Sequence, residues 1–215
     1  MQPAHEFLIF ALGKRQVILF GGSWGSALAV HMAQARPELF SAYVGTSQLV
    51  GGRLNPPASW QALRERASSA ADATTVEMLD AIGAPPWTNP RAFGMVRRAT
   101  RVYEAAVTEP APPGWWTPSP AYADPRLLTD YEAGEDYSYL QFVGMRGDGL
   151  LSRLDLPALG TKFAMPVVML QGEQDLVTVP SVSRAYFDSI DAPSKRYILL
   201  PRTGHDPNPE MLGAQ

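Results

Sequence analysis

The sequence contains no cysteine, only three histidines and no long hydrophobic run. Without cysteine, the chain can hold no disulfide, no thiolate metal site and no cysteine nucleophile. The longest apolar stretches, residues 7–12 and 17–20, are too short to span a bilayer. The start of the chain shows neither the basic segment nor the small-residue cleavage site of a signal peptide. These absences predict a cytoplasmic protein with no membrane partner.

The excess of acidic over basic residues is also small. The net charge is −3, and the chain has no run of basic residues. Nothing in this pattern favours a nucleic acid or an anionic membrane as a partner. Hydrophobic residues make up 46% of the 215 residues, which is enough for the core of one domain or of one domain with an insertion.

The first part of the chain has the pattern of a βαβ unit. Residues 17–20 and 40–45 are short apolar runs typical of strands, and residues 26–35 between them are rich in helix formers. The run 17–20 has no polar alternation, which predicts a parallel strand buried on both faces. Residues 5–12 before it are expected to form a helix that ends at Gly13.

The same alternation returns near the end of the chain. Residues 166–170 and 196–200 are predicted strands, and residues 179–190 between them are a predicted helix. We therefore expect an α/β fold with a mostly parallel sheet flanked by helices.

The middle of the chain differs from both ends. Residues 60–71 and 91–106 have amphipathic helical patterns, and many of the 20 prolines fall between residues 55 and 125. We find no strand pattern there. The sequence thus predicts a core in two parts, residues 1–50 and 156–215, with a helical cap insertion at residues 51–155.

Gly21-Gly22-Ser23-Trp24-Gly25 fits the G-x-S-x-G nucleophile elbow, in which a serine lies on a sharp turn between a strand and a helix. Small residues are expected two positions before and two positions after the serine. A glycine-rich turn that binds phosphate is the alternative, but G-x-G-x-x-G and the P-loop lysine are both missing. The context of a strand before and a helix after favours Ser23 as a nucleophile.

A serine nucleophile needs a histidine base and a carboxylate to orient it. His205 follows the last predicted strand, whereas His5 and His31 lie in predicted helices and are expected to be surface or packing residues. An exposed loop histidine is the alternative for His205. Asp175 follows the strand at residues 166–170, so the residues run Ser, Asp, His along the chain, as in α/β-hydrolases.

Other carboxylates lie close to these loops. Glu173 could replace Asp175, although a solvated loop charge is the simpler interpretation. Asp206 adjoins His205 in the sequence, where the two side chains would diverge.

These motifs resemble the proline iminopeptidase (prolyl aminopeptidase) family of α/β-hydrolases. Gly21–Ser26 is similar to its elbow, and Gln171–Asp175 and Gly204-His205 fall where the family carries its acid and base. The resemblance covers nearly the whole chain, and it implies an α/β-hydrolase fold with a helical cap. It also implies release of N-terminal proline through an acyl-enzyme, with no metal or organic cofactor and with the free amino end bound by cap carboxylates.

Two features depart from that family. Its His-Gly-Gly-Pro-Gly oxyanion loop before the elbow is not found, and only about twenty residues precede Ser23. The chain also ends ten residues after His205, where no closing helix is expected. We therefore expect an N-terminally truncated family member in which the backbone N–H of Trp24 is the one oxyanion donor. Such a chain is expected to show weak activity and an exposed apolar sheet edge at residues 17–20.

Candidate substrate-binding residues lie in the middle segment. Glu132 and Glu135, with Asp136, could anchor a substrate ammonium, although a solvated acidic turn is the favoured interpretation. Trp115 and Trp116, with Trp87, could line an apolar pocket or form a packing surface.

The leading function is therefore an aminopeptidase acting on N-terminal proline or small apolar residues. A carboxylesterase with the same triad is the main alternative, because the fold does not select the substrate. A catalytically impaired hydrolase remnant that acts as a binding module is the alternative from a different class.

Overall fold

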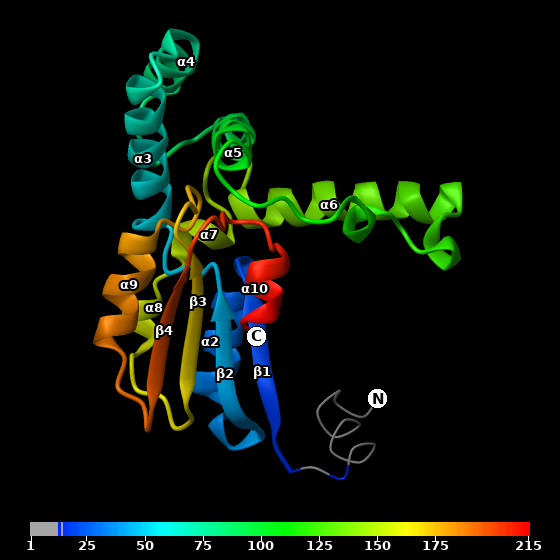
Figure 1. Cartoon of the computed structure of the whole chain (residues 1–215), viewed down its shortest axis with the longest axis vertical. Helices are drawn as coiled ribbons and strands as arrows, with labels where there is room; N and C mark the ends of the chain where they lie inside the picture. The colour runs from blue at the N-terminus through cyan, green and yellow to red at the C-terminus, as the bar shows by residue number, and fades with distance from the viewer. Residues whose placement is uncertain (1–12, 14) are drawn as a thin grey trace.

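Among the described residues, four parallel strands form the sheet in the lower half of the molecule (Figure 1). The computed structural model describes residue 13 and residues 15–215, so the helix expected over residues 5–12 lies outside the described residues. The strands lie side by side in chain order: β1 (Val17–Gly22), β2 (Phe40–Thr46), β3 (Val167–Gly172) and β4 (Lys195–Leu200). All four predicted strands are confirmed within two residues.

The two faces of the sheet are covered by different helices. Tyr43, Val167 and Met169 point to one face, where they join the main core with residues of α2 (Trp24–Ala35) and α9 (Pro180–Ser189). Leu170 and Leu200 point to the other face and pack against Met211 of α10 (Pro209–Gly213). This alternation follows from the two-residue period of a strand.

Strand β1 is buried on one face only, which corrects the expectation of burial on both faces. Leu19 lies in the main core, whereas Ile18 and Phe20 on the opposite face are 65% and 50% exposed. An unbroken apolar run shows that both faces of a strand are apolar, but burial depends on what packs against each face. Among the described residues, β1 pairs with β2 alone.

Helices occupy the chain between β2 and β3. They comprise α3 (Asn55–Ser69), α4 (Ala73–Ile82), α5 (Pro90–Ala105), α6 (Pro125–Val143), α7 (Leu150–Arg153) and α8 (Leu156–Leu159), with short 3₁₀ turns η2 (Pro113–Trp116) and η3 (Pro120–Tyr122). Residues 51 and 155, where we place the borders of the insertion, are joined by an antiparallel bridge. The chain thus leaves and re-enters the α/β part at one place.

The prolines of this region begin helices as well as interrupt them. Asn89 and Asp124 cap α5 and α6 by accepting the N–H two residues on, and Pro90 and Pro125 take the first helical position. Asn208-Pro209 begins α10 similarly, except that Asn208 accepts the N–H three residues on, from Met211. An Asx cap followed by proline is a strong helix start, because proline lacks the N–H that would have no partner there.

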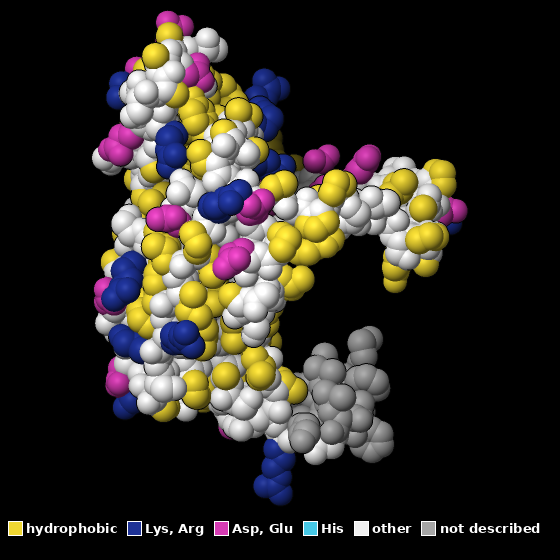
Figure 2. Space-filling model, viewed as in Figure 1, with side chains coloured by type: hydrophobic (Ala, Val, Ile, Leu, Met, Phe, Trp, Pro, Cys, Tyr) yellow, Lys and Arg dark blue, Asp and Glu magenta, His cyan; other side chains and the backbone are white. Residues whose placement is uncertain are grey.

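Helix α6 extends away from the rest of the molecule as an arm (Figure 1). Val143, its last residue, is its one buried residue. Figure 2 shows apolar side chains on this arm, and the exposed ones in α6 are Leu127, Leu128, Tyr131, Tyr137, Tyr139 and Leu140. The acidic segment 131–137, for which we considered a turn, therefore lies in the middle of a helix.

The end of the chain also differs from expectation. No helix was expected after His205, but residues 209–213 form α10, which packs on the sheet through Met211. In the part of the chain that the structure describes, no helix combines the length and the apolar character needed to cross a bilayer.

Candidate active site

Ser23 is the single residue between the end of β1 and the start of α2. Its φ of 50° lies in the left-handed region, which is unusual for a residue with a side chain. Its backbone N–H donates to the Thr46 carbonyl at 3.0 Å, which ties the turn to the end of β2. The chain therefore holds a strained conformation at the one serine that the motif singles out.

The glycines around Ser23 are not equally required. A Cβ on Gly21 would collide with the Gly25 carbonyl and lie 2.9 Å from the Ala29 Cβ, so only glycine fits there. A Cβ on Gly25 would meet open space. The expected need for a small residue therefore holds two positions before the serine and not two positions after it.

Ser23, His205 and Asp175 form one hydrogen-bonded chain. The Oγ of Ser23 lies 2.9 Å from Nε2 of His205, and Nδ1 of His205 lies 3.2 Å from both carboxylate oxygens of Asp175. The three residues come from loops after β1, β4 and β3, which end at the same edge of the parallel sheet. The structure thus brings together the three residues predicted from their positions after strands.

Asp175 is held by more than its histidine. Its oxygens accept hydrogen bonds from the Thr178 N–H at 2.7 Å, the Thr178 Oγ1 at 2.6 Å, the Val177 N–H at 2.8 Å and the Gln171 Nε2 at 2.9 Å. The side chain is 1% exposed. A buried carboxylate with this many donors is fixed in orientation and stays ionised.

The pKa values of this pair move apart. Burial alone would raise the pKa of Asp175, but the charge of His205 and the hydrogen bonds from His205 and Thr178 outweigh it and lower that pKa to about 2. Burial alone would lower the pKa of His205, but the charge and hydrogen bond of Asp175 raise it above 6.5. The geometry thus stabilises an imidazolium next to Ser23, as proton transfer from a hydroxyl requires.

A cavity of about 200 Å³ opens beside Ser23. Among the described residues that line it, Arg97 alone is charged, and the apolar lining includes Trp24, Leu49, Pro56, Trp87, Phe93, Val96, Tyr139, Phe142, Val143 and Leu151. Most of these side chains come from α3, α5, α6 and α7. The cavity can take a small apolar group bonded to Ser23.

A second cavity, of about 510 Å³, lies on another side of the same residues. Ser23 and His205 line it together with Phe20, Trp115 and Met211. A group on Ser23 therefore has space in two directions, one enclosed by the helical segment and one bounded by β1 and α10.

The model of the alpha/beta hydrolase fold family matches residues 4–210 of the chain. The chain belongs to the alpha/beta hydrolase family. This alpha/beta hydrolase is 28% identical over 210 residues to "Probable aminopeptidase YbaC" of Bacillus subtilis (strain 168). That alignment covers 95% of this chain and 64% of the relative, so the chain spans less than two thirds of the relative's length.

Solved structures show the same fold. VinJ superposes with a TM-score of 0.57 and 21% identity over 97% of this chain and 66% of VinJ. Proline iminopeptidase of Mycobacterium smegmatis gives a TM-score of 0.52 and 22% identity, over 93% of this chain and 62% of that one. At these identities the likeness establishes the fold of this alpha/beta hydrolase and leaves its substrate open.

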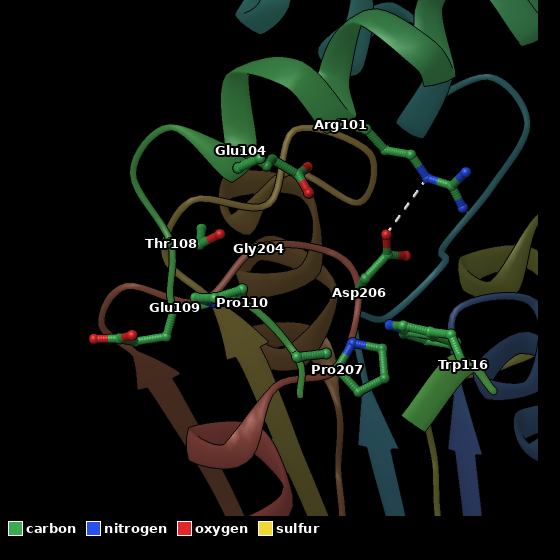
Figure 3. Close-up of a pocket in the computed structure, with 11 residues that line it drawn as sticks. Arg101, Glu104, Thr108, Glu109, Pro110, Trp116, Gly204, Asp206 and Pro207 are labelled. Carbon is green, nitrogen blue, oxygen red and sulfur yellow. Dashed lines mark ion pairs between the residues drawn. The ribbon is translucent and has the colours of Figure 1, made fainter. Parts of the chain in front are cut away.

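The structure separates the candidate substrate-binding residues of this hydrolase. Glu132 and Glu135 lie on the exposed arm α6, where Glu135 accepts a hydrogen bond from Tyr131, and neither is among the residues that line the cavity at Ser23. Trp115 lines the second cavity beside Ser23 and His205. Trp116 lines a different hollow, of about 580 Å³, with Arg101, Glu104 and Asp206 (Figure 3).

The remaining candidates take other positions. Glu173 is exposed, His31 is exposed on α2, and His5 lies outside the described residues. Asp206 pairs with Arg97 at 2.6 Å and with Arg101 at 3.5 Å. Trp24 begins α2, where the first N–H groups of a helix have no partner within the helix.

Two residues beside the chain escaped the sequence-based prediction. Thr178 donates to Asp175 and lies 3.3 Å from Nδ1 of His205. Glu104 is buried on α5 and accepts the backbone N–H of His205 at 3.0 Å. The sequence did contain a signal for Glu104. At four-residue spacing, Glu104 continues the buried stripe of α5 formed by Ala92, Val96 and Thr100, and a carboxylate is unusual on such a stripe.

Proposed function

We propose that this alpha/beta hydrolase is a serine hydrolase in which Ser23 forms the acyl-enzyme. The hydrogen-bonded chain from Ser23 through His205 to Asp175 is the observation that carries the proposal. His205 Nε2 takes the hydroxyl proton while Ser23 Oγ bonds to the substrate carbonyl carbon. His205 then gives that proton to the leaving group as the bond between the leaving group and the carbonyl carbon breaks. In the second step His205 takes a proton from water while the water oxygen bonds to the acyl carbon, and this proton passes to Ser23 Oγ as the bond between Oγ and the acyl carbon breaks.

The negative charge on the carbonyl oxygen needs hydrogen-bond donors. The backbone N–H of Trp24 is our proposed donor, since it follows the nucleophile at the N-terminus of α2. The partial positive charge of that helix end favours the same oxygen. Asp175 stabilises the imidazolium while the charge exists.

The substrate we propose is the N-terminal residue of a peptide, proline or another small apolar residue. The apolar cavity of about 200 Å³ beside Ser23 suits such an acyl group. The name of the 28% identical relative, a probable aminopeptidase, supports the same reaction. The chemistry is acyl transfer with no step that calls for a cofactor.

A carboxylesterase is the second candidate, and one observation favours it. No carboxylate is found among the described residues that line the 200 Å³ cavity, and the one charged side chain there, Arg97, is a cation. The carboxylate of Asp206 lines the second cavity instead. A cation disfavours a substrate ammonium, whereas an ester needs no charged anchor. Both reactions use the same three residues.

The two candidates are separated by matched substrates. An aminopeptidase should hydrolyse prolyl p-nitroanilide with a kcat/KM about 10- to 100-fold above that of its N-acetyl analogue, because a charge-assisted contact to the free amine contributes about 1.5–3 kcal/mol. Equal rates for the two amides, together with faster hydrolysis of p-nitrophenyl butyrate, would identify a carboxylesterase.

The pH dependence of kcat/KM should show an acid limb with its midpoint above pH 6.5. His205 must be neutral to accept the Ser23 proton, and Asp175 raises the pKa of that imidazole. The charged, inactive form therefore persists to higher pH than for a free histidine. A steady-state profile from pH 5 to 9 measures the midpoint, and a limb centred below pH 6 would contradict the assignment of His205 as the base.

A further inference from the structure

A buried carboxylate from the helical segment contacts both loops that carry the acid and the base. Glu104 lies near the end of α5 and is 5% exposed. Its Oε1 accepts the backbone N–H of Leu176 at 2.8 Å, and its Oε2 accepts the backbone N–H of His205 at 3.0 Å. Leu176 directly follows Asp175, so one side chain joins the two loops.

The loop around His205 is shaped to receive this carboxylate. Figure 3 shows Glu104 extending from α5 toward the loop that carries Gly204 and Asp206. A Cβ on Gly204 would lie 2.7 Å from the Glu104 Oε2, so a larger residue would displace the carboxylate. The acid loop is fitted in a similar way, because Leu176 packs into the core formed by α3, α4 and α5.

Burying a carboxylate is unfavourable unless hydrogen bonds compensate for the lost hydration. An apolar residue in place of Glu104 on the buried face of α5 would avoid this cost. The compensation here comes from two backbone N–H groups that belong to the triad loops. The two loops also meet directly, since the Gln174 N–H donates to the Thr203 carbonyl at 2.9 Å. Glu104 joins both loops to α5, whereas the ion pairs of Asp206 with Arg97 and Arg101 join α5 to the histidine loop alone.

We propose that Glu104 is a positioning residue that fixes the acid loop and the histidine loop relative to each other, so that His205 stays within hydrogen-bond distance of Ser23. This inference rests on the proposed acyl transfer at Ser23. It makes helix α5 part of the support of the triad, because the 2.9 Å distance between Ser23 Oγ and His205 Nε2 depends on the loop that Glu104 holds.

The charge of Glu104 should also affect the pH dependence of kcat/KM, through the pKa of His205. The charged groups that act on His205 are Asp175 and Glu104, which raise its pKa, and Arg97, which lowers it. Arg97 is itself paired with Asp206, which also pairs with Arg101. Removing the charge of Glu104 while keeping its shape should therefore lower the pKa of His205 and shift the acid limb of kcat/KM to lower pH.

The test compares Glu104→Gln, which keeps the shape and loses the charge, with Glu104→Asp, which keeps the charge and withdraws the oxygens by one methylene. Glu109→Gln is the matched control, since Glu109 is exposed and lines the same hollow. Both Glu104 variants should lower kcat by about 10- to 100-fold with little change in KM, because small misplacements of a catalytic group have effects of that order. The acid limb should move to lower pH in Glu104→Gln and stay in place in Glu104→Asp, and the control should match the wild type.

Substrate comparison separates positioning from substrate binding. A positioning role predicts the same fold-loss with p-nitrophenyl butyrate as with prolyl p-nitroanilide. A loss confined to the free-amine substrate would overturn the proposal and make Glu104 a ligand of the ammonium. An unchanged kcat in both folded Glu104 variants would overturn it as well.

Amide hydrogen exchange tests the hydrogen bonds of Glu104 to the two loops and does not require turnover of a substrate. Exchange at the Leu176 and His205 N–H groups should become faster in Glu104→Ala than in the wild type, while exchange in β2 and β3 stays unchanged. If the wild type neither turns over a substrate nor reacts with a fluorophosphonate, the proposed function fails, and the exchange data still decide whether Glu104 holds the loops. Equal exchange at both amides in wild type and Glu104→Ala would contradict the proposal whatever the activity.

Discussion

Replacing Ser23 by alanine is expected to lower kcat by about 10⁶-fold, the order seen when the nucleophile of a serine hydrolase is removed. The variant keeps the backbone of the elbow, because alanine has the same Cβ as serine and the Ser23 N–H still donates to Thr46. It lacks the oxygen that bonds to the substrate. Hydrolysis of prolyl p-nitroanilide and p-nitrophenyl butyrate by the purified variant measures the loss for both candidate reactions.

Ser26→Ala is the control from the same hexapeptide. Ser26 Oγ donates to the Ser23 carbonyl at 2.6 Å and accepts the Leu49 N–H at 3.0 Å, so it supports the elbow without facing His205. We expect this variant to lose some stability and to keep most of its turnover per folded molecule. Comparable activity of wild type and Ser23→Ala would remove Ser23 from the reaction.

Replacing Asp175 by asparagine is expected to slow kcat by roughly 10⁴-fold, as in serine proteases with the equivalent change. The amide puts an N–H₂ where the carboxylate accepts from five donor groups, so it favours the wrong tautomer of His205 and removes the charge that stabilises the imidazolium. Kinetics with the ester substrate, together with a thermal melt, separate the loss of turnover from the loss of stability.

Glu173→Gln is the matched control for that change. Glu173 lies two residues from Asp175 in the same loop but is exposed, so neutralising it should alter kcat less than about twofold. The opposite ranking, with a mild Asp175→Asn and a severe Glu173→Gln, would give Glu173 the orienting role.

Much of the α/β part could be predicted from the sequence because its strands are short apolar runs. Residues 17–20, 40–45, 166–170 and 196–200 each lie within an observed strand or begin one residue before it. Parallel strands end at one edge of the sheet, so residues that follow them meet there. Together with the G-x-S-x-G motif and the Ser, Asp, His order along the chain, that rule predicted that Ser23, Asp175 and His205 come together.

The helical segment was harder because burial there depends on how helices pack against each other. Helix α6 carries Gly134 and acidic residues, and with most of its surface exposed it has no sharp apolar stripe. Its start signal, Asp124-Pro125, was present, but the proline suggested irregular structure rather than a helix start. The prediction of a substrate anchor at Glu132 and Glu135 rested on composition, whereas the arm geometry of α6 separates both from the cavity at Ser23.

The central claim is that Ser23 is an activated nucleophile, and reaction with a fluorophosphonate tests it most directly. We expect one adduct per wild-type chain, located by peptide mass spectrometry on Ser23 and lost in Ser23→Ala. Its rate of formation should fall as His205 becomes protonated. No adduct on the folded wild-type chain, or an adduct that remains in Ser23→Ala, would contradict the account, and the first of these results would point to a non-catalytic binding module.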